Sequence, residues 1–109
     1  MSEKVVFIYV TFPSEEEAKK IGKILLEERL CACINLYSQV KSFYWWEGKI
    51  EEATESILIV KTRKALAKKV EETILKYHSY TVPCIMVFSA EEGFKPFIEW
   101  IYRETKEDL

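Results

Sequence analysis

The sequence predicts an α+β fold of the ferredoxin-like type, in which a split βαβ arrangement forms an antiparallel sheet with helices on one face. Two observations lead to this prediction. Extended and helical stretches follow one another in the order βαββαβα, and the second and third extended stretches are long and joined by only two residues. The 109 residues contain no low-complexity or Pro/Gly/Ser-rich stretch that would divide them. We therefore expect one domain over residues 1–109, with a long hairpin and an extra C-terminal helix.

The first two elements are a strand and a helix. Residues 4–12, KVVFIYVTF, form a run of β-branched and aromatic residues that stops at Pro13, which predicts a strand with both faces buried. Ser14 and Glu17 then match a capping box, which opens a helix that should end near Arg29. The residues that recur at the spacing of one helical face are Ala18, Ile21, Gly22 and Leu25.

The next two elements form a hairpin. Residues 31–46, CACINLYSQVKSFYWW, and residues 49–62, KIEEATESILIVKT, both lack a helical period. Glu47 and Gly48 join them, and Gly48 supplies the positive φ that a tight turn needs. Strands of about 13 residues, at about 3.3 Å each, reach some 40 Å, so the tip should extend beyond the body of so small a domain.

The second half of the chain supplies a helix, a strand and a last helix. The first of these has an apolar stripe of Leu66, Val70, Ile74 and Tyr77. It must end before Pro83, and residues 84–90, CIMVFSA, read as the fourth strand. After Gly93, Pro96 suits the first turn of a final helix. One face of that helix carries Phe97, Trp100 and Ile101.

The two central strands are apolar on both faces, although the helices of this fold cover only one. In the first strand, the two faces carry Val5, Phe7 and Tyr9 against Val6, Ile8 and Val10. In the fourth strand, they carry Met86 and Phe88 against Ile85 and Val87. An exposed apolar sheet of this size would exceed the few hundred Å² usual for a soluble monomer, and the last helix is short. We therefore expect another copy of the chain to cover this face in a closed homo-oligomer.

The aromatic residues before the turn support the same expectation. Tyr44 and Trp46 should point to one face of the hairpin, and Phe43 and Trp45 to the other. One core cannot take both pairs, which argues against the alternative that they simply cap the core of their own chain. Exposed aromatic rings are well suited to anchoring an interface.

Composition excludes several classes of protein. The net charge is −2 with Lys and Glu intermixed, so no basic stripe is available for nucleic acid. The apolar run near the N-terminus is too short for a secretory signal and nothing reaches the length of a membrane span, so we expect a cytoplasmic protein without membrane contact. Three cysteines, an odd number without a disulfide spacing, read as free thiols.

An ordered set of motifs gives a resemblance that covers nearly the whole chain. The stretch ERLCACINLYSQVKSFYWWEGKIEEATESILIVKT, followed by HSYTVP and FIEWI, resembles the CutA divalent-cation-tolerance family. The matching positions are Cys33, Asn35, Tyr44, Trp46, Gly48, Lys49, Glu55, Lys61, His78, Tyr80, Pro83 and Trp100. The chain departs from the family pattern at Ser79, where Pro is usual, at Cys84, where Glu is usual, and at Phe97, where Tyr is common. Some relatives carry a His and a Cys where this chain has Tyr77 and Val10, so a copper site of that composition is not expected.

The resemblance implies a ferredoxin-like homotrimer in which long hairpins form sheet between subunits, and a link to tolerance and binding of divalent cations such as copper. It implies a pocket between subunits at Glu55, Lys61 and Tyr80. The residues expected at the trimer interface are Tyr44, Trp45, Trp46 and Trp100.

The candidate metal ligands are His78, Cys84 and Cys33. His78 is the only histidine, and imidazole is the commonest transition-metal donor. Thiolates would direct the site toward copper(I) or zinc. Two structural interpretations stay open: His78 as a hydrogen-bonded helix end, and the cysteines as small buried hydrophobic residues. No motif requires a cofactor.

Catalysis is not expected. The sequence lacks a Gly-x-Ser-x-Gly elbow, a glycine-rich phosphate loop and a recognisable Cys/His pair, and Glu51, Glu52 and Glu55 read as a solvated strand face. One alternative is a trimeric small-molecule sensor like the PII proteins, with its ligand in clefts between subunits, although those proteins carry a long loop where this chain has Glu47 and Gly48. A second is an acylphosphatase-like enzyme, but the loop after the first strand is acidic here.

Overall fold

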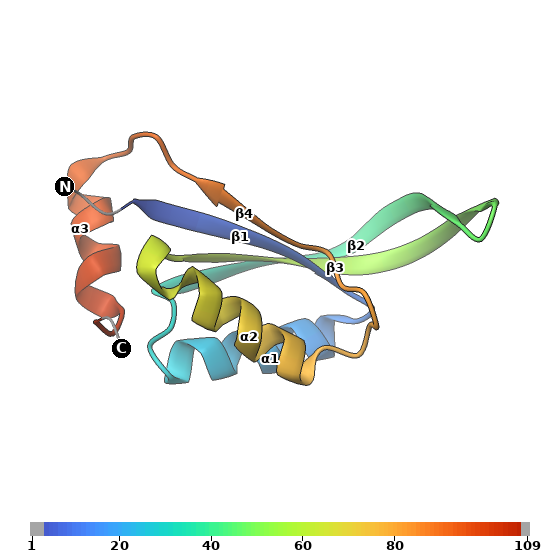
Figure 1. Cartoon of the computed structure of the whole chain (residues 1–109), viewed down its shortest axis with the longest axis horizontal. Coiled ribbons are helices and arrows are strands. Elements are labelled where there is room, and N and C mark those ends of the chain that lie inside the picture. The colour runs from blue at the N-terminus through green and yellow to red at the C-terminus, as the bar shows by residue number, and fades with distance from the viewer. Residues whose placement is uncertain (1–3, 108–109) are drawn as a thin grey trace.

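The computed structural model describes residues 4–107, and Figure 1 shows the arrangement of the elements. The order βαββαβα predicted from the sequence is confirmed. The elements are β1 (Val5–Phe12), α1 (Glu15–Glu27), β2 (Cys33–Trp46), β3 (Lys49–Arg63), the 3₁₀ turn η1 (Lys64–Leu66), α2 (Ala67–Tyr77), β4 (Ile85–Ser89) and α3 (Lys95–Glu104). No helix in this part of the chain is both long enough and apolar enough to span a bilayer.

The four strands form one antiparallel sheet in the order β2-β3-β1-β4, which confirms the ferredoxin-like fold. In Figure 1, α1 and α2 lie along one face of the sheet, and α3 stands at the end opposite the hairpin tip. The β2–β3 hairpin extends past both helices, and the molecule measures 46 × 26 × 21 Å. The predicted overhang of the hairpin is therefore present.

The core lies between the sheet and the helices α1 and α2. Its fully buried side chains include Val6, Ile8, Val10, Phe12, Ile21, Leu25, Leu58, Val60, Val70 and Ile74. We call the other side of the sheet the open face; it carries Phe7, Tyr9, Met86 and Phe88. There Phe7 and Tyr9 are half-buried, while Met86 and Phe88 are 54% and 58% exposed. Within one chain β1 is therefore buried on its helix side only, and the burial of its second face against another copy stays a prediction.

Two predicted details of the helices differ in the structure. The backbone N–H of Glu17 donates to Ser14 Oγ at 3.1 Å, as in a capping box, but the Glu17 carboxylate accepts from Ser79 instead of returning to Ser14. The end of α1 at Glu27 agrees with the predicted end near Arg29, whose φ of 60° breaks the helix. Tyr77 does not belong to the buried stripe of α2, because it is 40% exposed.

The turn at the hairpin tip agrees with the prediction, since Gly48 has φ 81°; the preceding Glu47 also has a positive φ, 49°. Farther down the hairpin, β2 contains a β-bulge that the sequence did not reveal. Tyr37 pairs with Ile57 and Val40 with Glu55, so β2 has one residue more than β3 between these pairs.

Gln39 lies in the bulge with φ 63°. Because side chains alternate along a strand, the extra residue reverses which positions of β2 face which side of the sheet. Beyond the bulge, Tyr44 and Trp46 therefore lie on the open face, the same side as Tyr37 and Tyr9.

Candidate functional site

A groove of about 610 Å³ lies on the open face, where the hairpin leaves the body of the domain. Three strands and the loop between α2 and β4 form its walls. The lining residues are Tyr9, Thr11, Ser42, Tyr44, Trp46, Glu55, Ser79, Tyr80, Thr81, Val82 and Cys84. The bulge in β2 is essential to this arrangement, because it turns Ser42, Tyr44 and Trp46 toward the groove.

Glu55 and Tyr80 form the polar centre of the groove. The Tyr80 hydroxyl donates to Glu55 Oε2 at 2.8 Å. Burial, together with this hydrogen bond, raises the pKa of Tyr80, so the hydroxyl stays protonated and remains a donor. Burial also raises the pKa of Tyr9, with further contributions from Cys84 and Glu55. The negative charge of Glu55 therefore contributes to raising the pKa of both tyrosines.

His78 holds the wall of the groove from behind. Its side chain is 1% exposed, and its ring stacks on Phe12 with centroids 4.5 Å apart and planes 14° apart. The backbone N–H of Tyr80 donates to Nδ1 at 3.0 Å, so Nδ1 carries no proton in this arrangement. Nε2 therefore bears the proton and donates to the carbonyl oxygen of Thr11 at 2.8 Å. Both ring nitrogens are engaged by backbone groups, which fits the structural role that the sequence left open.

Glu17 fixes the loop that follows His78. Its carboxylate accepts from the backbone N–H of Ser79 at 2.9 Å and from the Ser79 hydroxyl at 2.8 Å. Glu17 Oε2 also lies 3.5 Å from His78 Nδ1. The loop that supplies Tyr80 to the groove is thus tied to the first turn of α1 and to β1.

The three predicted metal ligands lie at different places. His78 is behind the wall, Cys84 is exposed and lines the groove, and Cys33 lies on β2 opposite Lys61. Lys61 is six residues from Glu55 along β3, which places Cys33 about 20 Å along the sheet from Glu55, and Cys33 does not line the groove. Among residues 4–107, no group of three His, Cys, Asp or Glu side chains is arranged to hold a metal ion. The metal-binding roles of these residues stay a prediction.

Of the three residues predicted to line a pocket between subunits, the structure brings together Glu55 and Tyr80 only. Lys61 lies near the other end of the sheet. Its ammonium group is 5.0 Å from the centroid of the Phe7 ring and 5.7 Å from that of Phe97, which belongs to α3. This helix therefore covers part of the open face at that end.

The residues predicted at a trimer interface are mostly exposed in the single chain. Trp45, Trp46 and Tyr44 are 72%, 57% and 43% exposed at the hairpin. Trp100 is half-buried on α3, where it stacks on Phe97 with ring centroids 5.6 Å apart. Their role in an interface stays a prediction.

Sequence reasoning missed the roles of Tyr9, which lines the groove, and of Glu17, which anchors the loop beside it. The sequence predicts Glu17 only as part of a helix cap, and Tyr9 only as an apolar strand residue. Ser79 departs from the family pattern. In the structure, its backbone N–H and its hydroxyl both donate to the Glu17 carboxylate and so anchor the loop. The departure was the one available signal, because a proline at position 79 would have neither the N–H nor the hydroxyl.

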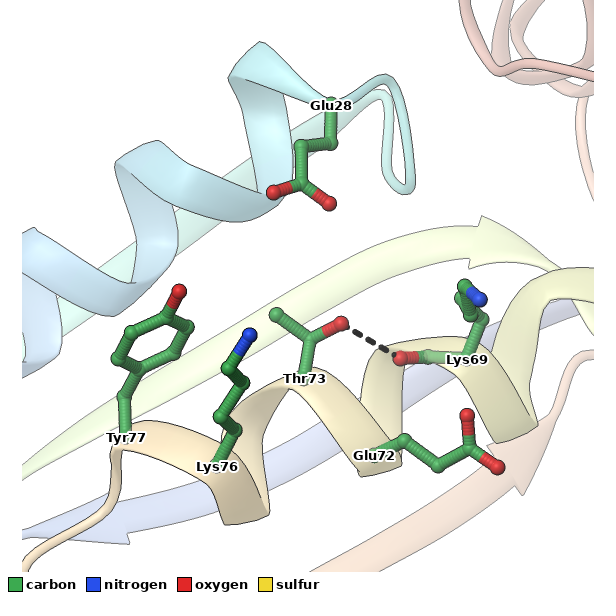
Figure 2. Close-up of a pocket in the computed structure, with 6 residues that line it drawn as sticks. All are labelled: Glu28, Lys69, Glu72, Thr73, Lys76 and Tyr77. Carbon is green, nitrogen blue, oxygen red and sulfur yellow. Dashed lines mark hydrogen bonds between the residues drawn. The ribbon is translucent and has the colours of Figure 1, made fainter.

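A second hollow, of about 290 Å³, lies between the end of α1 and the outer side of α2 (Figure 2). Figure 2 shows Glu28, which directly follows α1, facing a row of side chains from α2 that includes Lys69, Glu72 and Lys76. The Thr73 hydroxyl donates to the carbonyl oxygen of Lys69 at 2.8 Å. Positive and negative side chains are balanced here, which is typical of an ordinary solvated helix surface.

The chain matches the model of one protein family, described as CutA1 divalent ion tolerance protein, over residues 6–104. Two archaeal relatives are named divalent-cation tolerance protein CutA. The protein of Archaeoglobus fulgidus is 53% identical over 95 residues, covering 87% of this chain and 92% of that protein. The protein of Pyrococcus horikoshii is 43% identical over 102 residues, covering 94% of this chain and 99% of that protein.

Solved structures show the same similarity. The CutA1 crystal structure from Ehrlichia chaffeensis has a TM-score of 0.92 at 33% identity, and covers 98% of this chain and 100% of that one. A structure from Archaeoglobus fulgidus, described as the periplasmic divalent cation tolerance protein CutA, has a TM-score of 0.90 at 49% identity, with coverages of 94% and 99%.

Proposed function

This chain belongs to the CutA1 divalent ion tolerance family, and from this premise we propose that it works as a homotrimeric binding protein without catalytic activity, in the tolerance of divalent cations. The observation that carries the proposal is the open face together with the hairpin. Met86 and Phe88 on the open face and Trp45 and Trp46 at the hairpin are all more than half exposed. Apolar surface of this extent favours burial against another copy.

The composition of the groove supports a binding role over a catalytic one. Cys84 is the thiol that lines it, and in the described part of the chain no histidine is free to act as its base, because both nitrogens of His78 are engaged. The Glu55 carboxylate already accepts the hydroxyl of Tyr80. A nucleophile activated by a neighbouring base needs such a pair within hydrogen-bond reach.

For a metal ion, the donors within residues 4–107 of one chain do not form a complete site. Direct binding would need donors from more than one copy, with Cys84 as the exposed thiol at the groove. We expect copper or zinc over magnesium, because thiolates favour soft and borderline ions. The cytoplasmic location expected from the sequence stays a prediction, since one relative is described as periplasmic.

Light scattering on the purified protein at micromolar concentration tests the assembly. The expected mass is three times the 12.9 kDa of one chain, and a mass of 12.9 kDa would contradict the proposal. Calorimetric titration of copper and zinc into the wild type and Cys84→Ser tests the metal. We expect the serine variant to bind copper more weakly, and equal affinities would remove the Cys84 thiol from any metal site.

A further inference from the structure

We propose that the first turn of α1 holds the hairpin at its root from both faces of the sheet, and so sets the hairpin aromatics in the position needed for assembly between copies. The hairpin root consists of residues 37–40 of β2 and residues 55–57 of β3. Glu15 and Glu17 hold it, Glu15 directly and Glu17 through the loop before β4. The inference rests on the proposed function, since it concerns how the copies assemble.

The hairpin root lies where the body of the sheet ends and the two-stranded hairpin begins. β3 pairs with β1 from Ser56 onward, whereas residues 49–55 of β3 pair with β2. The bulge in β2 falls at this boundary. A bulge bends and twists its strand, and a hairpin of two strands is only marginally stable by itself. The direction in which the hairpin leaves the body is therefore decided at the root.

On the helix side of the sheet, Glu15 holds the bulge. The Ser38 hydroxyl donates to Glu15 Oε1 at 2.7 Å, and Lys19 Nζ lies 3.5 Å from Glu15 Oε2, so both carboxylate oxygens have partners. The hydrogen bond from Ser38, with a further contribution from Lys19, lowers the pKa of Glu15, so the carboxylate is ionised at neutral pH and accepts strongly. Next to Ser38, Gln39 has φ 63°, which is costly for a residue other than glycine. Such a conformation persists only where neighbouring contacts hold it.

On the open face, Tyr80 holds the same root from the other side. Its hydroxyl donates at 2.8 Å to Oε2 of Glu55, the residue opposite Val40. The loop that carries Tyr80 is itself bound to α1, because Ser79 donates its N–H and its hydroxyl to Glu17. In Figure 1, the start of α1 and the loop before β4 both lie at the end of the domain from which the hairpin extends. The contacts on both faces therefore lead back to one helical turn.

The length of the hairpin makes its root important for assembly. Trp46 is six residues beyond Val40, which at about 3.3 Å per residue places it about 20 Å from the root. A rotation of about 15° at the root would move the ring by about 5 Å over that length, enough to take it out of a packed interface. Holding the root before the copies meet lowers the entropic cost of association. The contacts at the root are internal to one chain, so they are present whichever surface a second copy covers.

Ser38→Ala removes the contact on the helix side and leaves every hairpin aromatic in place. In sedimentation over a dilution series, it should raise the concentration of half-dissociation about five-fold, and the double variant Ser38→Ala/Tyr80→Phe about 25-fold. Ser38→Thr keeps a hydroxyl and should behave like the wild type. The matched control is Thr54→Val, which removes the 3.2 Å hydrogen bond from Lys41 within the hairpin, beyond the root. It should also dissociate like the wild type.

Hydrogen–deuterium exchange separates positioning of the hairpin from a general loss of stability. At a concentration where both proteins are assembled, the amides of residues 41–54 should exchange faster in Ser38→Ala than in the wild type, while those of α2 keep the wild-type rates. Equal acceleration in the hairpin and in α2, or unchanged dissociation of the double variant, would overturn the proposal. If light scattering shows the wild type to be a monomer, the proposed function fails, whereas exchange at residues 41–54 still reports whether the root is held. The two failures are therefore distinguishable.

Discussion

Trp45 gives the sharpest test of the assembly, because it lies at the hairpin tip but not in the groove. It is 72% exposed and pairs with Ile50, itself 64% exposed, on the face opposite Trp46. A tryptophan side chain presents about 200 Å², so this exposure leaves about 140 Å² for an interface. At about 25 cal/mol per Å², burying that area stabilises the assembly by about 3.5 kcal/mol for each copy. Trp45→Ala should therefore weaken each interface roughly 300-fold.

Analytical ultracentrifugation over a dilution series measures this effect. Trp45→Ala should fall toward the 12.9 kDa monomer at concentrations where the wild type stays assembled. The control is Tyr77→Ala, an exposed aromatic residue on α2, on the helix side of the molecule (Figure 2). It should dissociate like the wild type. If Trp45→Ala does so as well, the tip is not buried in the assembly and the reasoning from exposed area fails.

Three further predictions concern the thiols and the loop anchor. With iodoacetamide at pH 8, the exposed Cys84 should be alkylated first and Cys31 last, because burial raises the pKa of Cys31 to about 12; mass spectrometry of the peptides checks the order. Since Cys31 ionises near 9 when unfolded, its contribution to stability is complete below pH 9 and is lost as the pH rises toward 12, by about 1.4 kcal/mol per unit. Urea unfolding of Cys31→Ala should therefore depend less on pH in this window, and an equal dependence would contradict the assignment. Glu17→Ala should lower the free energy of unfolding by about 2 kcal/mol, because it removes both hydrogen bonds to Ser79. The neighbouring Glu16→Ala should have little effect, and equal losses would show that the anchor is unimportant.

Much of the fold follows from local patterns in the sequence. The stripe of Ala18, Ile21 and Leu25 is buried as the helical period predicts, and the turn at Glu47 and Gly48 closes the hairpin as expected. These features depend on neighbours a few residues apart, which a single sequence reveals. The buried and open faces of the sheet also follow, because helices on one side leave the other uncovered.

The groove could be predicted only in part, because its walls come from distant segments. The hairpin aromatics were expected to be exposed at an overhang, and Glu55 was expected near Tyr80 from the family resemblance. The contact between Glu17 and Ser79 joins positions 62 residues apart, and the sequence offers no signal for it beyond the serine at a position where the family usually has proline. The positive φ of Gln39 could not be predicted from the sequence either, because no glycine or asparagine marks the position.

The bulge at Gln39 also has a consequence for how β2 can vary between relatives. The extra residue reverses the alternation of side chains along β2. Odd-numbered residues face the open side before the bulge, and even-numbered residues do so after it. A substitution in β2 after the bulge changes the same face of the sheet only as long as the extra residue is present. Deleting it would exchange the roles of Trp45 and Trp46 without altering either side chain. Side chains in the two halves of β2 can therefore change independently of each other, whereas the number of residues between the two halves is fixed by the pairing with β3.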